Sequence, residues 1–324
     1  MPQNSANPLP LPPAPAPAPP PTAVVSCAVL EDEVRAFAAG LPHITDLAFL
    51  PQGLHNEPRR LNASVAAAVA GIEAGGRAEA IALVYGVCSR GIEAIPLRRC
   101  RLVVPRAHDC ITLFLGSKER YQRFQQENPA IYWYSPGWNK CHAAPGPDRF
   151  ARLRADFLKK FPEDEADYLI EMERELHAHY TTAAYVDVGI GDAAANIAYT
   201  RRCACWMGWD FQRVQGDPRL LRDLLAGHWD DDRFLVVQPR QFVRLSIDDR
   251  VIKAVDEASE GENPKAQKIK SQTNGGAEAP RDATGDPPAG LRGTGDPPAG
   301  SSATGDPPVS VDGEGVHGPA AHDS

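Results

Sequence analysis

The sequence lacks several features that would place it in a common class. No apolar run of about 18 residues occurs, so no transmembrane helix is expected. The first residues have neither a basic segment nor a continuous apolar stretch, which argues against a secretory signal. Neither a GxGxxG motif nor a Walker loop is present, and no two cysteines have CxxC spacing. We therefore expect a cytoplasmic protein without a standard nucleotide or zinc motif.

Aromatic residues are missing from both ends of the chain. Residues 1–21 contain ten prolines and no charge, and residues 254–324 contain nine prolines and twelve glycines. We predict an extended Pro-rich arm at 1–21 and a disordered tail at 254–324, in which Thr-Gly-Asp-Pro-Pro occurs three times. Residues 22–253 hold all 23 aromatic residues and all seven cysteines, which predicts one folded domain of ordinary size.

An excess of basic charge is also missing. Most of the formal net charge of −8 lies in residues 254–324, where there are twelve acidic and five basic residues. The central domain has 29 basic and 30 acidic residues. Electrostatic binding of nucleic acid is therefore not expected, and the acidity says nothing about a substrate.

Short apolar runs alternate with helical patterns along the central domain. This alternation predicts an α/β fold with a layered, mostly parallel sheet and crossover helices. We expect one helix over 111–126, and an aromatic loop at 131–138 that covers either a pocket for a planar cofactor or the edge of the sheet. The predicted strands are 23–27, 44–50, 80–85, 101–105, 184–188, 233–237 and 242–247.

Three cysteines follow three different predicted strands. Cys27 ends the first strand, Cys88 follows the third, and Cys110 follows the fourth. Parallel strands end at one edge of a sheet, so the three thiols are predicted to face one crevice. Together with His108, as ligand or acid–base group, they would suit zinc or another transition metal. Two alternatives stay open: buried structural thiols, and a metal-free redox or nucleophilic thiol at Cys88 or Cys110.

Glycine and arginine residues around the same strand ends are candidates for binding an anionic cofactor. Gly86 and Gly91 flank Arg90 in the turn after the third strand, and Arg106 follows the fourth. A glycine-rich turn can present backbone N–H groups to an anion, and arginine clamps carboxylates or phosphates. Surface ion pairs are the alternative for each arginine. Trp138, in the aromatic segment, is a candidate to cover the ligand.

Asp187 lies near the end of the strand at 184–188, before a glycine-containing turn. It is a candidate general base, or a partner that orients His108. Capping and turn chemistry are the alternative, and Asp192 is predicted to cap a helix that ends at about Met207.

The residues around these positions resemble domain-of-unknown-function family 1638. The motifs are PRAHDCITL (105–113), LGSKERY (115–121) and YGVCSRG (85–91), the last of which usually reads close to YGLCGNG in the family. The strand ending in Cys27 and the segments 132–138 and 185–187 also match. The resemblance covers about residues 23–245. Ser89 and Arg90 replace the small or amide residues usual in the family.

The resemblance implies a role in one-carbon transfer. Members of the family resemble proteins often encoded beside corrinoid-dependent methyltransferases of the uroporphyrinogen-decarboxylase type and their corrinoid carriers. One hypothesis is a metal-dependent methyl-transfer enzyme or subunit, with Cys27, Cys88, Cys110 and His108 around the metal. The other is a non-catalytic accessory protein that handles a corrinoid or metal cofactor for a partner corrinoid protein or methyltransferase.

Overall fold

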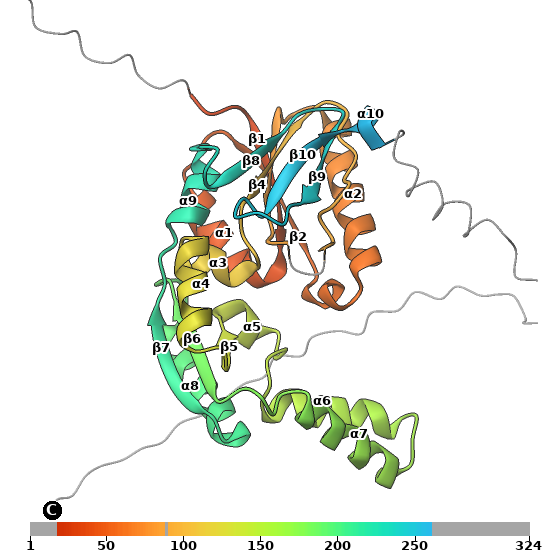
Figure 1. Ribbon diagram of the computed structural model, residues 1–324, viewed down its shortest axis with the longest axis vertical. Helices are drawn as coiled ribbons and strands as arrows, with labels where there is room; N and C mark the ends of the chain where they lie inside the picture. Colours follow the sequence, from red (N-terminus) through yellow and green to blue (C-terminus); the bar gives the residue numbers. More distant parts are fainter. Residues whose placement is uncertain (1–17, 88–89, 261–324) are drawn as a thin grey trace, which may run out of the picture. The chain divides into compact units, whose positions relative to one another are not determined.

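The computed structural model describes residues 18–87 and 90–260 (Figure 1). The chain divides into two compact units, Met1–Lys268 and Ile269–Ser324, and every described residue belongs to the first. The predicted arm at 1–21 and the predicted tail at 254–324 lie largely outside the described residues. Cys88 lies wholly outside them. Within the described part of the chain, no helix has both the length and the apolarity needed to cross a membrane.

A five-stranded sheet carries the carboxyl ends at which the site was predicted. Its order is β2-β1-β3-β4-β8, with β1 to β4 parallel and β8 antiparallel to β4. All residues of β1 and β3 are buried, as expected for strands covered by helices on both faces. The strands are β1 (Thr22–Cys27), β2 (Ile44–Leu50), β3 (Ala80–Val84), β4 (Arg101–Pro105) and β8 (Phe234–Val237).

Crossover helices cover the two faces of this sheet. After the turn η1 (Ala28–Leu30), α1 (Glu31–Ala38) connects β1 to β2, and α2 (Pro58–Gly75) connects β2 to β3. Figure 1 shows α2 on one face and α1 beside α9 (Arg219–Ala226) on the other. From β1 the chain adds β2 on one side and then β3 on the other, so the order of the strands across the sheet reverses at β1. Ligands bind at such switch points in open α/β sheets.

A second parallel sheet, of order β5-β6-β7, follows β4 in the chain. The helix between β6 and β7 begins where the sequence predicts, because the Asp192 side chain accepts a hydrogen bond from the N–H of Ala195 at 2.9 Å. Figure 1 shows α6 and α7 as an adjacent pair inserted between β5 and β6. The elements are β5 (Ile131–Tyr134), α5 (Pro136–Lys140), α6 (Pro147–Leu158), α7 (Glu163–Glu175), β6 (Thr182–Asp187), α8 (Ala193–Met207) and β7 (Asp210–Gln215).

A hairpin of β9 (Gln241–Leu245) and β10 (Ile252–Asp256) closes the described chain, followed by the short helix α10 (Glu257–Glu260). Arg106 joins this hairpin to β4. Its guanidinium is 3% exposed and donates to the carbonyl oxygens of Arg250 (3.0 Å) and Ile252 (2.6 Å). It also donates to the Asp231 carbonyl and forms an ion pair with the Asp231 carboxylate at 3.0 Å.

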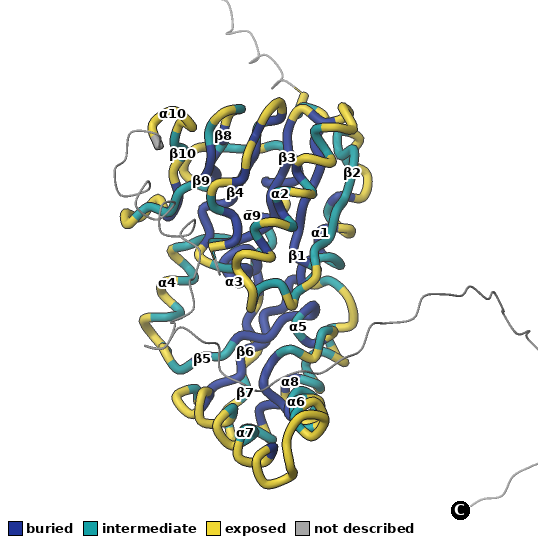
Figure 2. The backbone as a smooth tube through the Cα atoms, turned by 90° about the vertical axis from the view of Figure 1, so that its right-hand side faces the viewer, coloured by how far each residue is buried: buried dark blue, intermediate teal, exposed yellow. Residues whose placement is uncertain are grey.

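One apolar core connects the two sheets. Val25 of β1 and Leu83 of β3 belong to the same buried cluster as Trp133 of β5 and Val186 of β6. Figure 2 shows buried backbone continuing from β1 and β3 into β6. The surface between the sheets is therefore packed protein, and the site described below lies at its margin.

The predicted α/β class and the mostly parallel pairing are confirmed, with differences in detail. The helix expected over 111–126 is two helices, α3 (Cys110–Leu115) and α4 (Lys118–Glu127). They are separated by Gly116, which has a φ of +85° and leaves no room for a Cβ beside Asp217. The segment expected as a loop at 131–138 is β5 and the start of α5, because its aromatic side chains pack into the core.

Candidate functional site

A pocket of about 420 Å³ lies beyond the carboxyl ends of β2 and β4, against the start of the second sheet. His55, in the turn η2 (Gln52–Asn56), follows β2, whereas Asp109 and Cys110 follow β4. The remaining walls come from α4, β5, α5 and the segment before β6. The lining residues are His55, Asp109, Cys110, Ile111, Tyr121, Gln125, Pro129, Ile131, Tyr132, Trp133, Trp138, His179 and Tyr180. We call this cavity the aromatic pocket.

Aromatic rings form most of its walls. The ring of His55 meets Trp138 edge-on and stacks with Tyr85, in both cases with ring centroids 6.4 Å apart. Tyr132 and Tyr180 meet edge-on at 5.0 Å. Rings held in this way form rigid apolar walls that suit a flat organic ligand. Trp138 lines this pocket, and its role in covering a ligand stays a prediction.

Asp109 is the polar centre of the pocket. It caps α3, since its Oδ1 accepts a hydrogen bond from the N–H of Thr112 at 3.1 Å. The hydroxyl of Tyr121 also donates to its carboxylate, and the side chain of Gln125 donates in turn to that hydroxyl. Burial raises the pKa of Asp109 against these hydrogen bonds. The carboxyl group can thus hold a proton at a higher pH than an ordinary aspartate.

Gly86 fixes the position of Asp109 by a close contact between the two backbones. A Cβ on Gly86 would lie 2.4 Å from the Cα of Asp109, so only glycine allows the two backbones to approach this closely. The N–H of Val87 donates to the carbonyl of Ala107 at 3.0 Å. The glycine predicted to cradle an anion therefore joins the turn after β3 to the turn after β4.

His55 and Cys110 add two further chemical groups. Burial lowers the pKa of His55, partly offset by the charge of nearby Asp109, so a neutral imidazole is favoured at pH 7. Cys110 is the first residue of α3, is 6% exposed, and lines the pocket. A neutral base, a carboxyl group that can carry a proton and a thiol thus surround one cavity.

The predicted metal ligands that the structure describes lie in different surroundings. Cys27 ends β1 and is buried; burial raises the pKa of its thiol to about 11, although Tyr85 donates a hydrogen bond to it. His108 is exposed and stacks on Tyr121 at 5.9 Å. Among the described residues, no three His, Cys, Asp or Glu side chains are placed to hold a metal. Because Cys88 lies outside those residues, the metal site stays a prediction.

The remaining predicted binding residues have structural partners. Arg90 is exposed, has a φ of +56° and pairs with Glu93 at 2.7 Å. Gly91 lies against the side chain of Leu61, which leaves no room for a Cβ. The donors of Arg106 serve the β9–β10 hairpin, as described above. Arg90 thus matches the surface ion pair that the sequence left open as an alternative, whereas Arg106 is buried and bonds mainly to backbone carbonyls.

Asp187 lies in the second sheet, at the end of β6. Its carboxylate accepts a hydrogen bond from the N–H of Gly189 at 2.9 Å and pairs with Arg213 at 2.6 Å. Both contacts are turn and ion-pair chemistry. The residue is not among those that line the aromatic pocket.

Two residues singled out in the sequence, Cys110 and Trp138, line the aromatic pocket, whereas His55, Asp109 and Tyr121 line it without having been singled out. The position of Asp109 could be predicted from the sequence, because aspartate is a preferred N-cap residue. Its carboxylate can accept a hydrogen bond from the backbone N–H three residues later, here that of Thr112. His55 carried none, since a lone histidine in a loop does not indicate which cavity it faces.

The family model described as "Protein of unknown function (DUF1638)" matches residues 49–225. The matched stretch contains every residue that lines the aromatic pocket, whereas Cys27 precedes it. No curated protein and no solved structure matches the chain.

Proposed function

The chain belongs to the DUF1638 family, and because that family has no assigned function, we propose one from the geometry of the aromatic pocket. The pocket binds a small planar organic ligand, with Asp109 and His55 available for proton transfer and the Cys110 thiol beside the ligand. One observation carries the proposal: aromatic walls converge on three groups of different acid–base character in one cavity. This combination is typical of small-molecule sites.

The size of the pocket supports a ligand of ordinary metabolite dimensions. Its volume of about 420 Å³ lies within the range of small-molecule sites, about 300–1,000 Å³. A corrinoid is much larger than such ligands and would fit only in part. Any corrinoid involved in the function would therefore be presented by a partner protein.

A thermal-shift screen of planar metabolites with the full chain tests this proposal. We expect a compound that raises the melting temperature of the wild type but loses that effect in Trp138→Ala and Tyr121→Phe. Trp229→Phe is the control, because Trp229 lies outside the pocket and its indole N–H bonds to the Leu224 carbonyl. Equal stabilisation of all three variants would show that the ligand binds elsewhere.

A second candidate is the thiolate metal site in a methyl-transfer enzyme or subunit. The observation that favours it is the contact between the two turns, at Gly86 with Asp109 and at Val87 with Ala107. These turns lead to Cys88 and to Cys110. Zinc held by Cys27, Cys88 and Cys110, with His108 as a ligand or an acid–base group, would activate a substrate thiol or water if one position stays open, with a corrinoid protein or methyltransferase as partner.

Elemental analysis of the purified full chain separates this candidate from a metal-free thiol. One equivalent of zinc, lost in Cys110→Ser, is the expected result for the metal site. Absence of metal, together with rapid alkylation of Cys110 that no chelator changes, would favour a nucleophilic thiol instead.

A further inference from the structure

Large apolar side chains are exposed in a row along α7. Tyr168, Met172 and Leu176 follow one another at intervals of four residues, so they lie on one side of the helix. Their exposed fractions are 65%, 42% and 65%. Six large apolar side chains are exposed in the described part of the chain, and all except Ile247 lie within residues 158–176. Such a concentration marks an interaction site more often than chance exposure.

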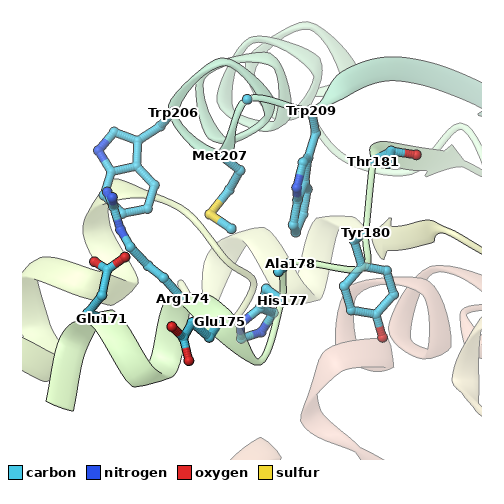
Figure 3. Close-up of a pocket in the computed structure, with 11 residues that line it drawn as sticks. Glu171, Arg174, Glu175, His177, Ala178, Tyr180, Thr181, Trp206, Met207 and Trp209 are labelled. Atoms are coloured by element: carbon cyan, nitrogen blue, oxygen red, sulfur yellow. The ribbon is translucent and has the colours of Figure 1, made fainter. Parts of the chain in front are cut away.

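A cavity of about 480 Å³ lies between the end of α7 and the end of α8. Glu171 and Glu175 line it and follow Tyr168 and Met172 by three residues, so they are the neighbours of the row on the helix surface. Figure 3 shows Trp206, Met207 and Trp209 on one side, facing Arg174 and Glu175 on the other. The Arg174 guanidinium lies 4.2 Å from the ring centroid of Trp206 and holds that ring in place. Tryptophan, tyrosine and arginine are the residues that most often anchor protein partners.

The charges of α7 are mostly acidic, and Arg174 is its one basic residue. The ion pairs between α7 and α6 use Glu163 and Asp167 with Arg154, and Glu173 with Arg149. Glu171 and Glu175 take no part in these pairs; both are exposed and line the cavity. Two carboxylates beside an apolar row are complementary to a segment that combines apolar and basic side chains.

We propose that the α7 row and this cavity, together the α7–α8 surface, form the docking site for a partner protein that presents a basic amphipathic helix. Its apolar side chains would cover Tyr168, Met172 and Leu176, with one inserted against Trp209 in the cavity. Its lysines or arginines would meet Glu171 and Glu175. A second copy of this chain fits less well, because a symmetric contact would set these carboxylates against each other.

Calorimetric titration of the full chain with model peptides tests the proposal. The probe is a helical peptide of leucine and lysine with leucines at i, i+3, i+4 and i+7, and the comparison peptide has glutamate in place of lysine. We expect the lysine peptide alone to bind, more weakly at high salt. The double variant Glu171→Lys/Glu175→Lys should weaken binding roughly tenfold or more.

Matched variants separate the surface from general effects of charge and apolar area. Glu79→Lys/Glu127→Lys makes the same charge change at two exposed acids away from α7 and should bind as the wild type does. Met172→Ser/Leu176→Ser should lose binding, whereas Ile247→Ser, at the exposed side chain outside 158–176, should not. Unchanged melting temperatures confirm that each variant is folded.

Four outcomes would overturn the proposal. The lysine peptide could fail to bind, or could bind no better than the glutamate peptide. Binding could persist in Glu171→Lys/Glu175→Lys. Sedimentation could also show a dimer of the wild type that Met172→Ser/Leu176→Ser abolishes, in which case a second copy covers the surface.

Discussion

At the scale of single residues, the aromatic pocket depends on how closely the turn after β3 approaches the turn after β4. Gly86 touches the backbone of Asp109, which leaves no space for any side chain between them. In that position the Asp109 carboxylate accepts hydrogen bonds from the N–H of Thr112 and from the hydroxyl of Tyr121. The size of one glycine thus determines where the central carboxyl group lies.

Gly86→Ala should destabilise the protein and displace Asp109. A methyl group 2.4 Å from backbone atoms forces the two turns apart, at a cost of about 1–3 kcal/mol in the free energy of unfolding measured in urea. Gly71→Ala is the control, because Gly71 is an exposed helical residue with nothing within 4 Å of an added Cβ. It should stabilise the protein by about 0.5–1 kcal/mol. Equal effects of the two substitutions would contradict the close approach.

Glu33, in the first turn of α1, is a buried carboxyl group that interacts electrostatically with Lys140 and Tyr185. Its side chain is fully buried, and neither carboxylate oxygen has a side-chain hydrogen-bond partner among the described residues. Burial raises its pKa from the ordinary 4.5 to about 7. The folded protein therefore keeps a proton that the unfolded chain releases between about pH 4.5 and 7.

Stability should fall as the pH rises through this window, since ionised Glu33 is disfavoured only in the folded state. The shift corresponds to roughly 3 kcal/mol, fully lost above pH 7. Glu33→Gln should remove this part of the fall, while Asp109, whose pKa is raised in the same direction, still contributes. Urea unfolding at pH 5 and pH 8 measures the difference. A wild type that is more stable at pH 8, or an unchanged slope in Glu33→Gln, would refute it.

At the scale of elements, Arg106 holds the β9–β10 hairpin against β4. Arg106→Met should lower the free energy of unfolding by about 2–4 kcal/mol, because it leaves the carbonyls of Arg250 and Ile252 without their buried donor. Proteolysis should then cut the hairpin first. Arg90→Met, at an exposed arginine, should change stability by less than about 0.5 kcal/mol. Similar losses in both variants would mean that Arg106 acts only through charge.

The sequence predicts the strands whose apolar pattern matches their buried position in the fold. β1 to β4 are short apolar runs, and all were expected within a residue or two. β7 was missed because its residues DFQRVQ are polar and mostly exposed, so its strand character comes from pairing with β6 rather than from its own pattern. β10 was missed for a related reason, since it is half exposed and pairs only with β9.

At the scale of the whole molecule, the division of the strands into two parallel-stranded sheets and a hairpin could not be predicted. Which strands pair depends on contacts between distant residues, and a list of strands and helices is compatible with one sheet or with two. The same limit applies to the site. Cys110 and Trp138 were predicted because they follow strands or belong to an aromatic motif, whereas His55 joins them only through the fold.

Residue-resolved alkylation gives the most direct test of the aromatic pocket as a binding site. The full chain is treated with iodoacetamide, with and without a stabilising compound from the screen, and each cysteine is followed by mass spectrometry. We predict that the compound slows alkylation of Cys110, which lines the pocket, and leaves exposed Cys205 unchanged. The proposed function would be contradicted if no compound that stabilises the protein changed the rate at which iodoacetamide alkylates Cys110.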